Sequence, residues 1–151
     1  GATLIMDLWG LARQPLLGIP APDYGLVGRW LGHMRLGRFR HDAIGKATPV
    51  AGERVIGWTA HYLIGIAFAA ALLAIWGHEW LEHPTPGPAL ITGLVTVAAP
   101  FLLMQPGMGA GIAASRTPNP GKARVQSLIT HAVFGLGLYG AGWTAHTLCL
   151  P

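Results

Sequence analysis

Two histidines in matching positions are the side chains best suited to chemistry in this chain. His61 and His131 each lie seven residues after an arginine and four residues before a glycine, and each arginine is followed by valine (Arg54, Val55 and Gly65; Arg124, Val125 and Gly135). Because each series would open a helix running in the same direction, the repeat indicates two helical hairpins related by a pseudo-two-fold axis.

The same spacing predicts a polar layer inside a bilayer. At about 1.5 Å of rise per residue, each histidine would lie roughly 10 Å beyond the cytoplasmic arginine that opens its helix. Asp7 precedes Arg13 on a descending helix and would lie at about the same depth, and Gln105 closes another span on that side. We therefore predict one layer that holds Asp7, His61, His131 and Gln105, and an ionisable residue at such depth suggests a functional site.

Four roles are open for this layer. Two histidines on parallel helices could supply axial nitrogens to haem b. Two histidines with Asp7 could hold a divalent metal that keeps open positions. The same groups could bind a quinone headgroup or pass protons, because histidine titrates near neutrality. Finally, the side chains could simply be hydrogen-bonded between neighbouring helices and keep the bundle in register.

Motifs of other chemistries are absent from the sequence. It has no phosphate-binding glycine loop, no Cys-His zinc pattern and no nucleophile elbow. The single cysteine, Cys149, excludes a disulfide framework. We therefore expect no enzymatic activity.

Composition predicts a protein whose solvent is mostly lipid. Of the 151 residues, 52% are hydrophobic and 11% are charged, whereas a soluble domain usually carries about 25% charged residues. The net charge of +4 comes from basic residues beside apolar runs, where they would face anionic headgroups. This placement argues against nucleic-acid binding.

Four apolar segments predict four transmembrane helices in an all-α membrane protein that forms a single domain, 1–151. A helix needs about 20 mostly apolar residues to span a bilayer, and the four segments are residues 1–17, 55–76, 88–105 and 125–148. The first is expected to begin before Gly1. Pro100 and Pro106 interrupt the third span, and the sequence leaves open whether residues 106–115 continue as a kinked helix or form a re-entrant segment.

The distribution of charge predicts the orientation. Arg13 lies near the end of the first segment, and the other nine Lys and Arg residues lie in the links 18–54 and 106–124. The link 77–87 carries Glu79 and Glu82 and no basic residue. The positive-inside rule places the basic links in the cytoplasm. Both termini would then lie on the outer, periplasmic side of a bacterial cytoplasmic (inner) membrane.

The first link also predicts a short amphipathic helix at residues 23–35, which would lie in the cytoplasmic interface with Asp23 as its N-cap. Five residues in and after it are candidates for the membrane interface or for lipid headgroups: Arg29, Trp30, Arg35, Arg38 and Arg40. A site where a partner docks is a second interpretation. A third is that these charges only set the topology.

Several stretches resemble a family of small, uncharacterised bacterial integral membrane proteins known only as a domain of unknown function. They cover most of the chain: 2–3 (AT), 6–9 (MDLW), 26–33 (LVGRWLGH), 37–41 (GRFRH), 60–68 (AHYLIGIAF), 111–118 (GIAASRTP) and 130–139 (THAVFGLGLY). The resemblance implies four membrane helices in a bacterial cytoplasmic membrane. It implies no activity, so no catalytic residue follows from it.

Three functions are weighed on these grounds. The preferred interpretation is a non-catalytic accessory subunit that packs against other integral membrane subunits or against copies of itself. The second is a redox protein that binds haem, a metal or a quinone through His61 and His131. The third is a carrier of small solutes or protons.

Overall fold

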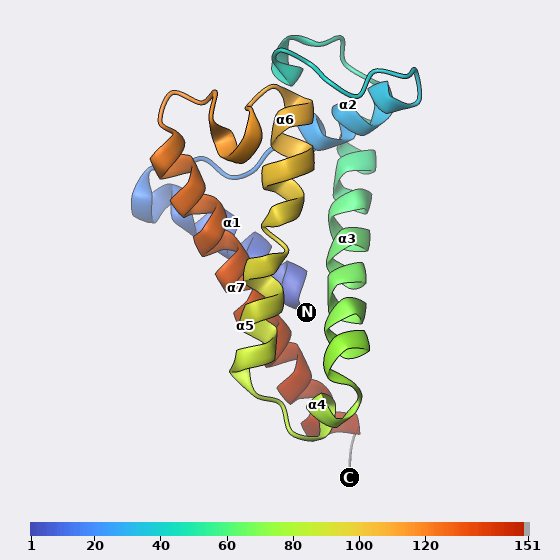
Figure 1. Ribbon diagram of the computed structural model, residues 1–151, viewed down its shortest axis with the longest axis vertical. Helices are drawn as coiled ribbons and strands as arrows, with labels where there is room; N and C mark the ends of the chain where they lie inside the picture. Colours follow the sequence, from blue (N-terminus) through green and yellow to red (C-terminus); the bar gives the residue numbers. More distant parts are fainter. Residues whose placement is uncertain (150–151) are drawn as a thin grey trace. The chain divides into compact units, whose positions relative to one another are not determined.

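The computed structural model describes residues 1–149, and every regular element in that range is helical. Four helices are longer than ten residues, and Figure 1 labels them α1 (Ala2–Leu17), α2 (Tyr24–Met34), α3 (Glu53–Trp76) and α7 (Pro120–Cys149). Shorter elements connect them: η1 (Ile44–Lys46), α4 (Glu79–Glu82), α5 (Pro86–Val95), the π-helical turn η2 (Pro100–Met104), α6 (Gln105–Met108) and η3 (Ile112–Ala114).

Helices lie where the apolar segments predicted them, with ends set by local chemistry. The predicted interfacial helix is α2, and the Asp23 carboxylate accepts a hydrogen bond from the Gly25 N–H at 2.9 Å, which caps its first turn. Helix α1 ends at Gly18, whose φ of 65° is left-handed and suits glycine. After α6 the chain leaves helical geometry at Gly109, so residues 106–115 form one helical turn, a loop and a 3₁₀ turn.

Two helices, rather than the four predicted spans, are long and apolar enough to cross a membrane by length and composition. They are α3 and the helical run Pro86–Met108. Helix α1 has only 16 residues. Helix α7 has 30 residues, but its many Gly, Thr and His residues keep its hydropathy low. The coarse prediction of an all-helical chain is confirmed, and the count of apolar spans is lower than predicted.

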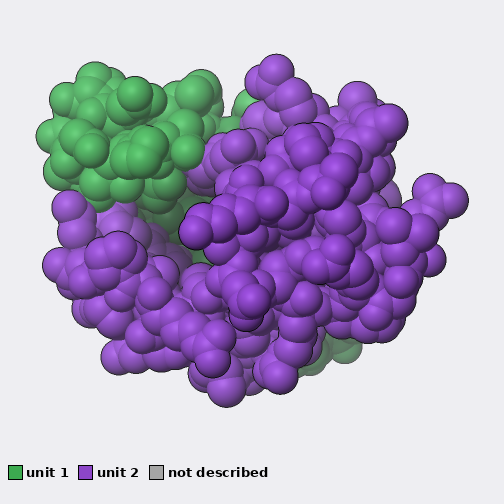
Figure 2. Space-filling view, turned by 90° about the horizontal axis from the view of Figure 1, so that it is seen from above, with its two compact units in different colours: residues 1–21, 64–97, 128–151 green, residues 22–63, 98–127 purple. Residues whose placement is uncertain are grey.

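The described chain forms two compact units, coloured separately in Figure 2. Unit 1 comprises residues 1–21, 64–97 and 128–151, and unit 2 comprises residues 22–63 and 98–127. Both units are assembled from segments far apart in sequence, because α3 and α7 each contribute one part to unit 1 and another to unit 2. The units therefore do not correspond to consecutive domains.

The core of unit 1 forms between α3, α5 and α7 around Trp80. Its buried members are Ala2, Leu72, Trp80, Ala89, Phe134 and Leu138. The Trp80 indole N–H donates to the Thr85 carbonyl oxygen at 3.1 Å, so the polar edge of this buried ring is satisfied. A methyl group at Gly142 would lie 2.6 Å from the Trp80 ring. The Trp80 ring can therefore occupy this position only because residue 142 of α7 has no side chain.

Glycines also let the helices of unit 1 approach closely. A Cβ atom at Gly65 of α3 would collide with the Thr3 hydroxyl of α1, and one at Gly135 of α7 would lie 2.9 Å from the Ala89 carbonyl oxygen of α5. These two glycines occupy matching positions in the sequence repeat. Gly65 thus packs α3 against α1, and Gly135 packs α7 against α5, which is the pairing expected of two hairpins.

Unit 2 is built around the crossing of α2 over the first turns of α3. A Cβ atom at Gly28 would collide with the Glu53 carbonyl oxygen, and one at Gly57 would collide with the Tyr24 carbonyl oxygen. Gly107 of α6 lies against the Trp30 ring, where a Cβ atom would come within 2.6 Å. The backbone contacts at Gly28 and Gly57 join α2 to α3, and the contact of Gly107 with the Trp30 ring joins α6 to α2.

Candidate functional site

His131 lies in a hydrogen-bonded site that the end of α5 creates. The Val97 N–H bonds to Leu94 instead of Gly93, so the Gly93 carbonyl leaves the helical ladder. The imidazole Nδ1 of His131 lies 3.2 Å from that carbonyl oxygen and 3.1 Å from the Thr96 hydroxyl oxygen. The broken helix thus supplies the polar partners that a partly buried histidine requires.

This network defines the tautomer of His131. The Thr96 hydroxyl donates its single proton to the Gly93 carbonyl at 2.7 Å. Because the carbonyl can only accept, His131 Nδ1 carries a proton, so in the neutral imidazole Nε2 presents a lone pair. A histidine held in this way joins α7 to α5, and it is also oriented as metal-ligating histidines commonly are.

His61 lies in an aromatic cluster of unit 2. Its ring stacks on Tyr24 of α2, with ring centroids 4.0 Å apart and planes at 25°. Trp58 and Tyr62 meet the same imidazole edge-on at 5.8 Å and 5.4 Å. The contact with Tyr24 joins α2 to α3 where the two helices cross, and the other two lie within α3.

The predicted polar layer is divided between the two units. Asp7 and His131 belong to unit 1, whereas His61 and Gln105 belong to unit 2. Each histidine has neighbours inside its own unit, and no group of three or more His, Cys, Asp or Glu residues within 1–149 is arranged to hold a metal ion. The joint layer stays a prediction.

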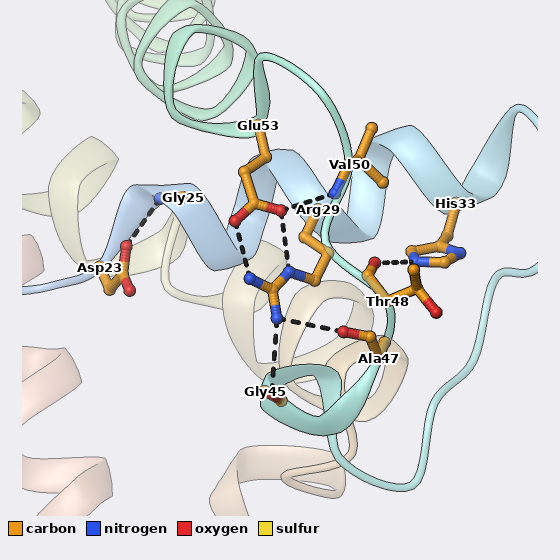
Figure 3. A network of polar contacts seen from close by, with 9 residues as sticks. All are labelled: Asp23, Gly25, Arg29, His33, Gly45, Ala47, Thr48, Val50 and Glu53. Carbon is orange, nitrogen blue, oxygen red and sulfur yellow. Dashed lines mark hydrogen bonds and ion pairs between the residues drawn. The ribbon is translucent and has the colours of Figure 1, made fainter.

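Arg29 and Glu53 form the strongest polar contact of unit 2 (Figure 3). The Arg29 Nε and Nη2 atoms donate to the two Glu53 carboxylate oxygens at 2.8 Å and 2.7 Å, which is a bidentate pair. The Val50 N–H donates to the same carboxylate at 2.9 Å, and Arg29 Nη1 donates to the Ala47 carbonyl oxygen at 3.2 Å. The pair thereby fastens the link 44–50 to α2 and α3.

The remaining candidates for contact with lipid headgroups differ in their hydrogen bonding and exposure. The Trp30 indole N–H donates to the Phe39 carbonyl oxygen at 2.9 Å, which holds the loop after α2. Arg35, Arg38 and Arg40 are exposed. Arg29 is occupied inside the unit, so the exposed arginines are the ones placed to meet an external anion.

A cavity of about 840 Å³ opens in unit 2 between the two basic links. Four cationic side chains line it: Arg38, Arg40, Lys46 and Arg116. Sequence reasoning did not select Lys46 or Arg116 as site residues. Their positive charge was visible, but their approach to Arg38 and Arg40 depends on contacts between links about 70 residues apart, such as the 2.9 Å bond from the His41 N–H to the Gly107 carbonyl oxygen.

The far wall of the cavity is a loop of unusual backbone conformation. Gly111 has a φ of 76°, and Ala113 and Ala114 have φ values of 47° and 58°. Left-handed geometry costs a residue with a Cβ atom about 1–2 kcal/mol. The Arg124 Nε–H donates to the Ala113 carbonyl oxygen at 2.8 Å, which helps to hold this strained turn. Strain of this kind is frequent at binding sites.

His41, which lines the cavity, forms a buried pair with His33. Their rings meet edge-on with centroids 5.0 Å apart, and the side chains are 8% and 5% exposed. His33 Nε2 donates to the Thr48 carbonyl oxygen at 2.9 Å. Burial, followed by the positive fields of His33 and Arg38, lowers the pKa of His41 below its ordinary value. His41 is therefore neutral near pH 7.

The fold defines this chain as an all-helical protein with two helices that could cross a membrane. Residues 1–145 match the family described as proteins of unknown function (DUF2938), and the chain belongs to that family. No curated protein and no solved structure matches the chain. The resemblance to a family of unknown function is thus confirmed, and it adds no activity to the residues described above.

Proposed function

We propose that this protein is a polytopic membrane protein that acts as a non-catalytic accessory subunit. The observation that carries the proposal is the exposure of apolar side chains on the long helices. Only 17% of the most apolar 18-residue window of α3 is buried, and Ile66 and Ile75 are 64% and 69% exposed. Water would not tolerate such a surface, whereas lipid or a partner helix would cover it.

The same argument extends to four spans. Leu8 and Leu11 of α1 are more than half exposed, as are Leu136 and Leu148 of α7. With α3 and the run Pro86–Met108, these helices make two hairpins. The positive-inside rule then orients both basic links to the cytoplasm and both termini to the outside of a bacterial inner membrane.

The state of the histidines supports an accessory role over a redox role. His131 is hydrogen-bonded to α5 and His61 is stacked on α2, so each has a packing role that needs no cofactor. Helices that expose large apolar residues along their length suit contact with further membrane helices. The partner is another integral membrane subunit or a second copy of this chain.

The decisive experiment is gentle extraction of the native protein, followed by measurement of polypeptide mass, visible absorbance and metal content. We expect a colourless, metal-free assembly whose polypeptide mass exceeds one 15.9 kDa chain by a fixed stoichiometry. A chain released by alkaline washing without detergent would refute the membrane assignment. A monodisperse single chain in several mild detergents would refute the accessory role.

A haem, metal or quinone site at His131 is the second candidate, because its network leaves Nε2 as a lone pair. A Soret band or a stoichiometric metal in the extracted protein that disappears in His131→Ala would favour it. His78→Ala, in the link 77–87, is the matched control.

A further inference from the structure

Four cations surround the cavity of unit 2 without a matching set of anions. Arg38, Arg40, Lys46 and Arg116 line it, and Asp42 is the one carboxylate on its described wall. Within residues 1–149 no ion pair joins any of these four cations to a carboxylate. Like charges held around one space repel each other, and an anion between them would remove that repulsion.

Polar and apolar groups share the cavity. Ser115 adds a hydroxyl group, whereas Ile112 on the same wall is 59% exposed. Leu36 and Phe39, which alternate with the arginines of the first link, are 75% and 60% exposed. Exposed apolar side chains between arginines are typical of a surface in the headgroup region, where one part meets acyl chains and the other meets phosphates.

The cavity has the size of a ligand site. A volume of about 840 Å³ lies within the usual range of roughly 300–1,000 Å³ for small-molecule pockets. Two of its four cations come from the loop after α2, one from the next turn and one from the loop after η3. Guanidinium groups from separate segments can bind the oxygens of one phosphate from different sides, which a single helix face cannot do.

We propose that this cavity is a binding site for a phosphate group carried by an anionic phospholipid. Arg38, Arg40, Lys46 and Arg116 bind the phosphate oxygens, Ser115 donates to the polar headgroup, and Ile112 contacts the start of an acyl chain. The phosphate chemistry depends on the cavity alone. The lipid as its source rests on the proposed membrane location, so the two parts are tested separately.

The test measures binding of three probes to the full chain in a neutral detergent: short-chain phosphatidylglycerol, short-chain phosphatidylcholine and inorganic phosphate. We expect phosphatidylglycerol to bind best, and Arg40→Gln and Arg116→Gln to weaken it about tenfold each, because each loses a charge-assisted contact. Arg116→Lys keeps the positive charge but loses the paired N–H donors of the guanidinium group, so it should lose less affinity for phosphatidylglycerol than Arg116→Gln.

The matched controls are Arg35→Gln and Lys122→Gln, which remove an exposed positive charge from the same two links outside the cavity wall. They should change the affinity by less than about twofold. Equal losses in all four glutamine variants would overturn the site, since binding would then follow net charge. Thermal unfolding without probe identifies any variant that is misfolded. If an arginine variant is misfolded, Ser115→Ala tests the cavity wall in its place.

Comparing the affinities of the three probes shows whether the bound phosphate belongs to a lipid or is free. Inorganic phosphate that binds as tightly as phosphatidylglycerol, with the same dependence on Arg40 and Arg116, would support the phosphate site and overturn the lipid source. Equal binding of phosphatidylcholine would overturn the preference for an anionic headgroup. Neither result depends on whether the protein assembles with another subunit. Failure of the phosphate-binding proposal can therefore be distinguished from failure of the proposed accessory role.

Discussion

At the scale of single residues, the basic side chains of unit 2 divide into one that is neutralised and several that are not. Arg29 is held by Glu53 and by backbone carbonyls, with its side chain 13% exposed. Arg38, Arg40 and Arg116 line an open cavity. The first therefore stabilises the fold, and the others are free to bind an external anion.

Glu53→Gln should lower the thermal stability of the protein, because Arg29 would keep its charge in a partly buried place without a counter-ion. Glu79→Gln, in the link 77–87, should leave the unfolding temperature nearly unchanged. Arg29→Gln combined with Glu53→Gln should cost less than the sum of the single changes. Thermal unfolding in detergent measures all four variants, and strict additivity would contradict a coupled pair.

His131→Leu should destabilise unit 1 by about 1–2 kcal/mol, since the Gly93 carbonyl and the Thr96 hydroxyl lose their shared partner. Thr96→Val removes the same network from the other side, and the double variant should cost little more than either change. Equilibrium unfolding of the cofactor-free protein is the measurement. An unchanged midpoint for His131→Leu would refute the role of this histidine in packing.

His41 should make the protein less stable in mild acid. Its pKa in the folded chain is below the ordinary 6.5, because burial, His33 and Arg38 outweigh the backbone of Arg38 and the carboxylate of Asp42. Below pH 6.5 the unfolded chain binds the proton more readily, so its contribution to stability is complete above pH 6.5 and declines as pH falls toward the lowered pKa.

The check compares unfolding temperatures at about pH 7.5 and about pH 5.5 for the wild type and for His41→Gln. The variant should lose less stability on acidification than the wild type. His83→Gln, at an exposed position, controls for removal of an ordinary histidine. An identical acid-induced loss in the wild type and in His41→Gln would refute the assignment.

At the scale of elements, glycine decides how closely the helices pack. Gly135 and Gly140 both lie in α7, but a Cβ atom at Gly135 meets the backbone of α5, whereas one at Gly140 meets nothing within 4 Å. The two positions therefore separate the packing role of glycine from its weak helix propensity.

Gly135→Ala should destabilise the protein by about 1–3 kcal/mol because α5 must move away from α7. Gly140→Ala should be neutral or stabilising by up to about 1 kcal/mol, as alanine is the better helix former. Reversible unfolding of both variants under one condition provides the comparison. Equal effects of the two substitutions would show that close contact at Gly135 does not limit packing.

At the scale of the whole molecule, the proposed topology separates the basic links from the acidic link across a membrane. With Cys149 replaced by serine, a single cysteine at Lys46 should react with a membrane-impermeant thiol reagent only after cells are opened. A single cysteine at Glu79 should react in intact cells. Labelling of both positions in intact cells would contradict the orientation.

Much of the local structure followed from the sequence. The Asp23 cap, helix α2 and the helices containing His61 and His131 lie where spacing and hydropathy predicted them, because these features depend on neighbours within a few residues. The resemblance to a family of unknown function was also visible in short motifs, and the match over residues 1–145 confirms that part of it.

Tertiary structure decided what those residues contact. His131 finds its partners only because α5 breaks at Thr96, and Arg29 meets Glu53 only because Gly28 and Gly57 let two helices touch. The cavity needs Arg116 beside Arg40, which lie 76 positions apart in the chain. A sequence specifies each charge and each glycine, but contacts between distant segments depend on how whole helices pack, and no local pattern encodes that.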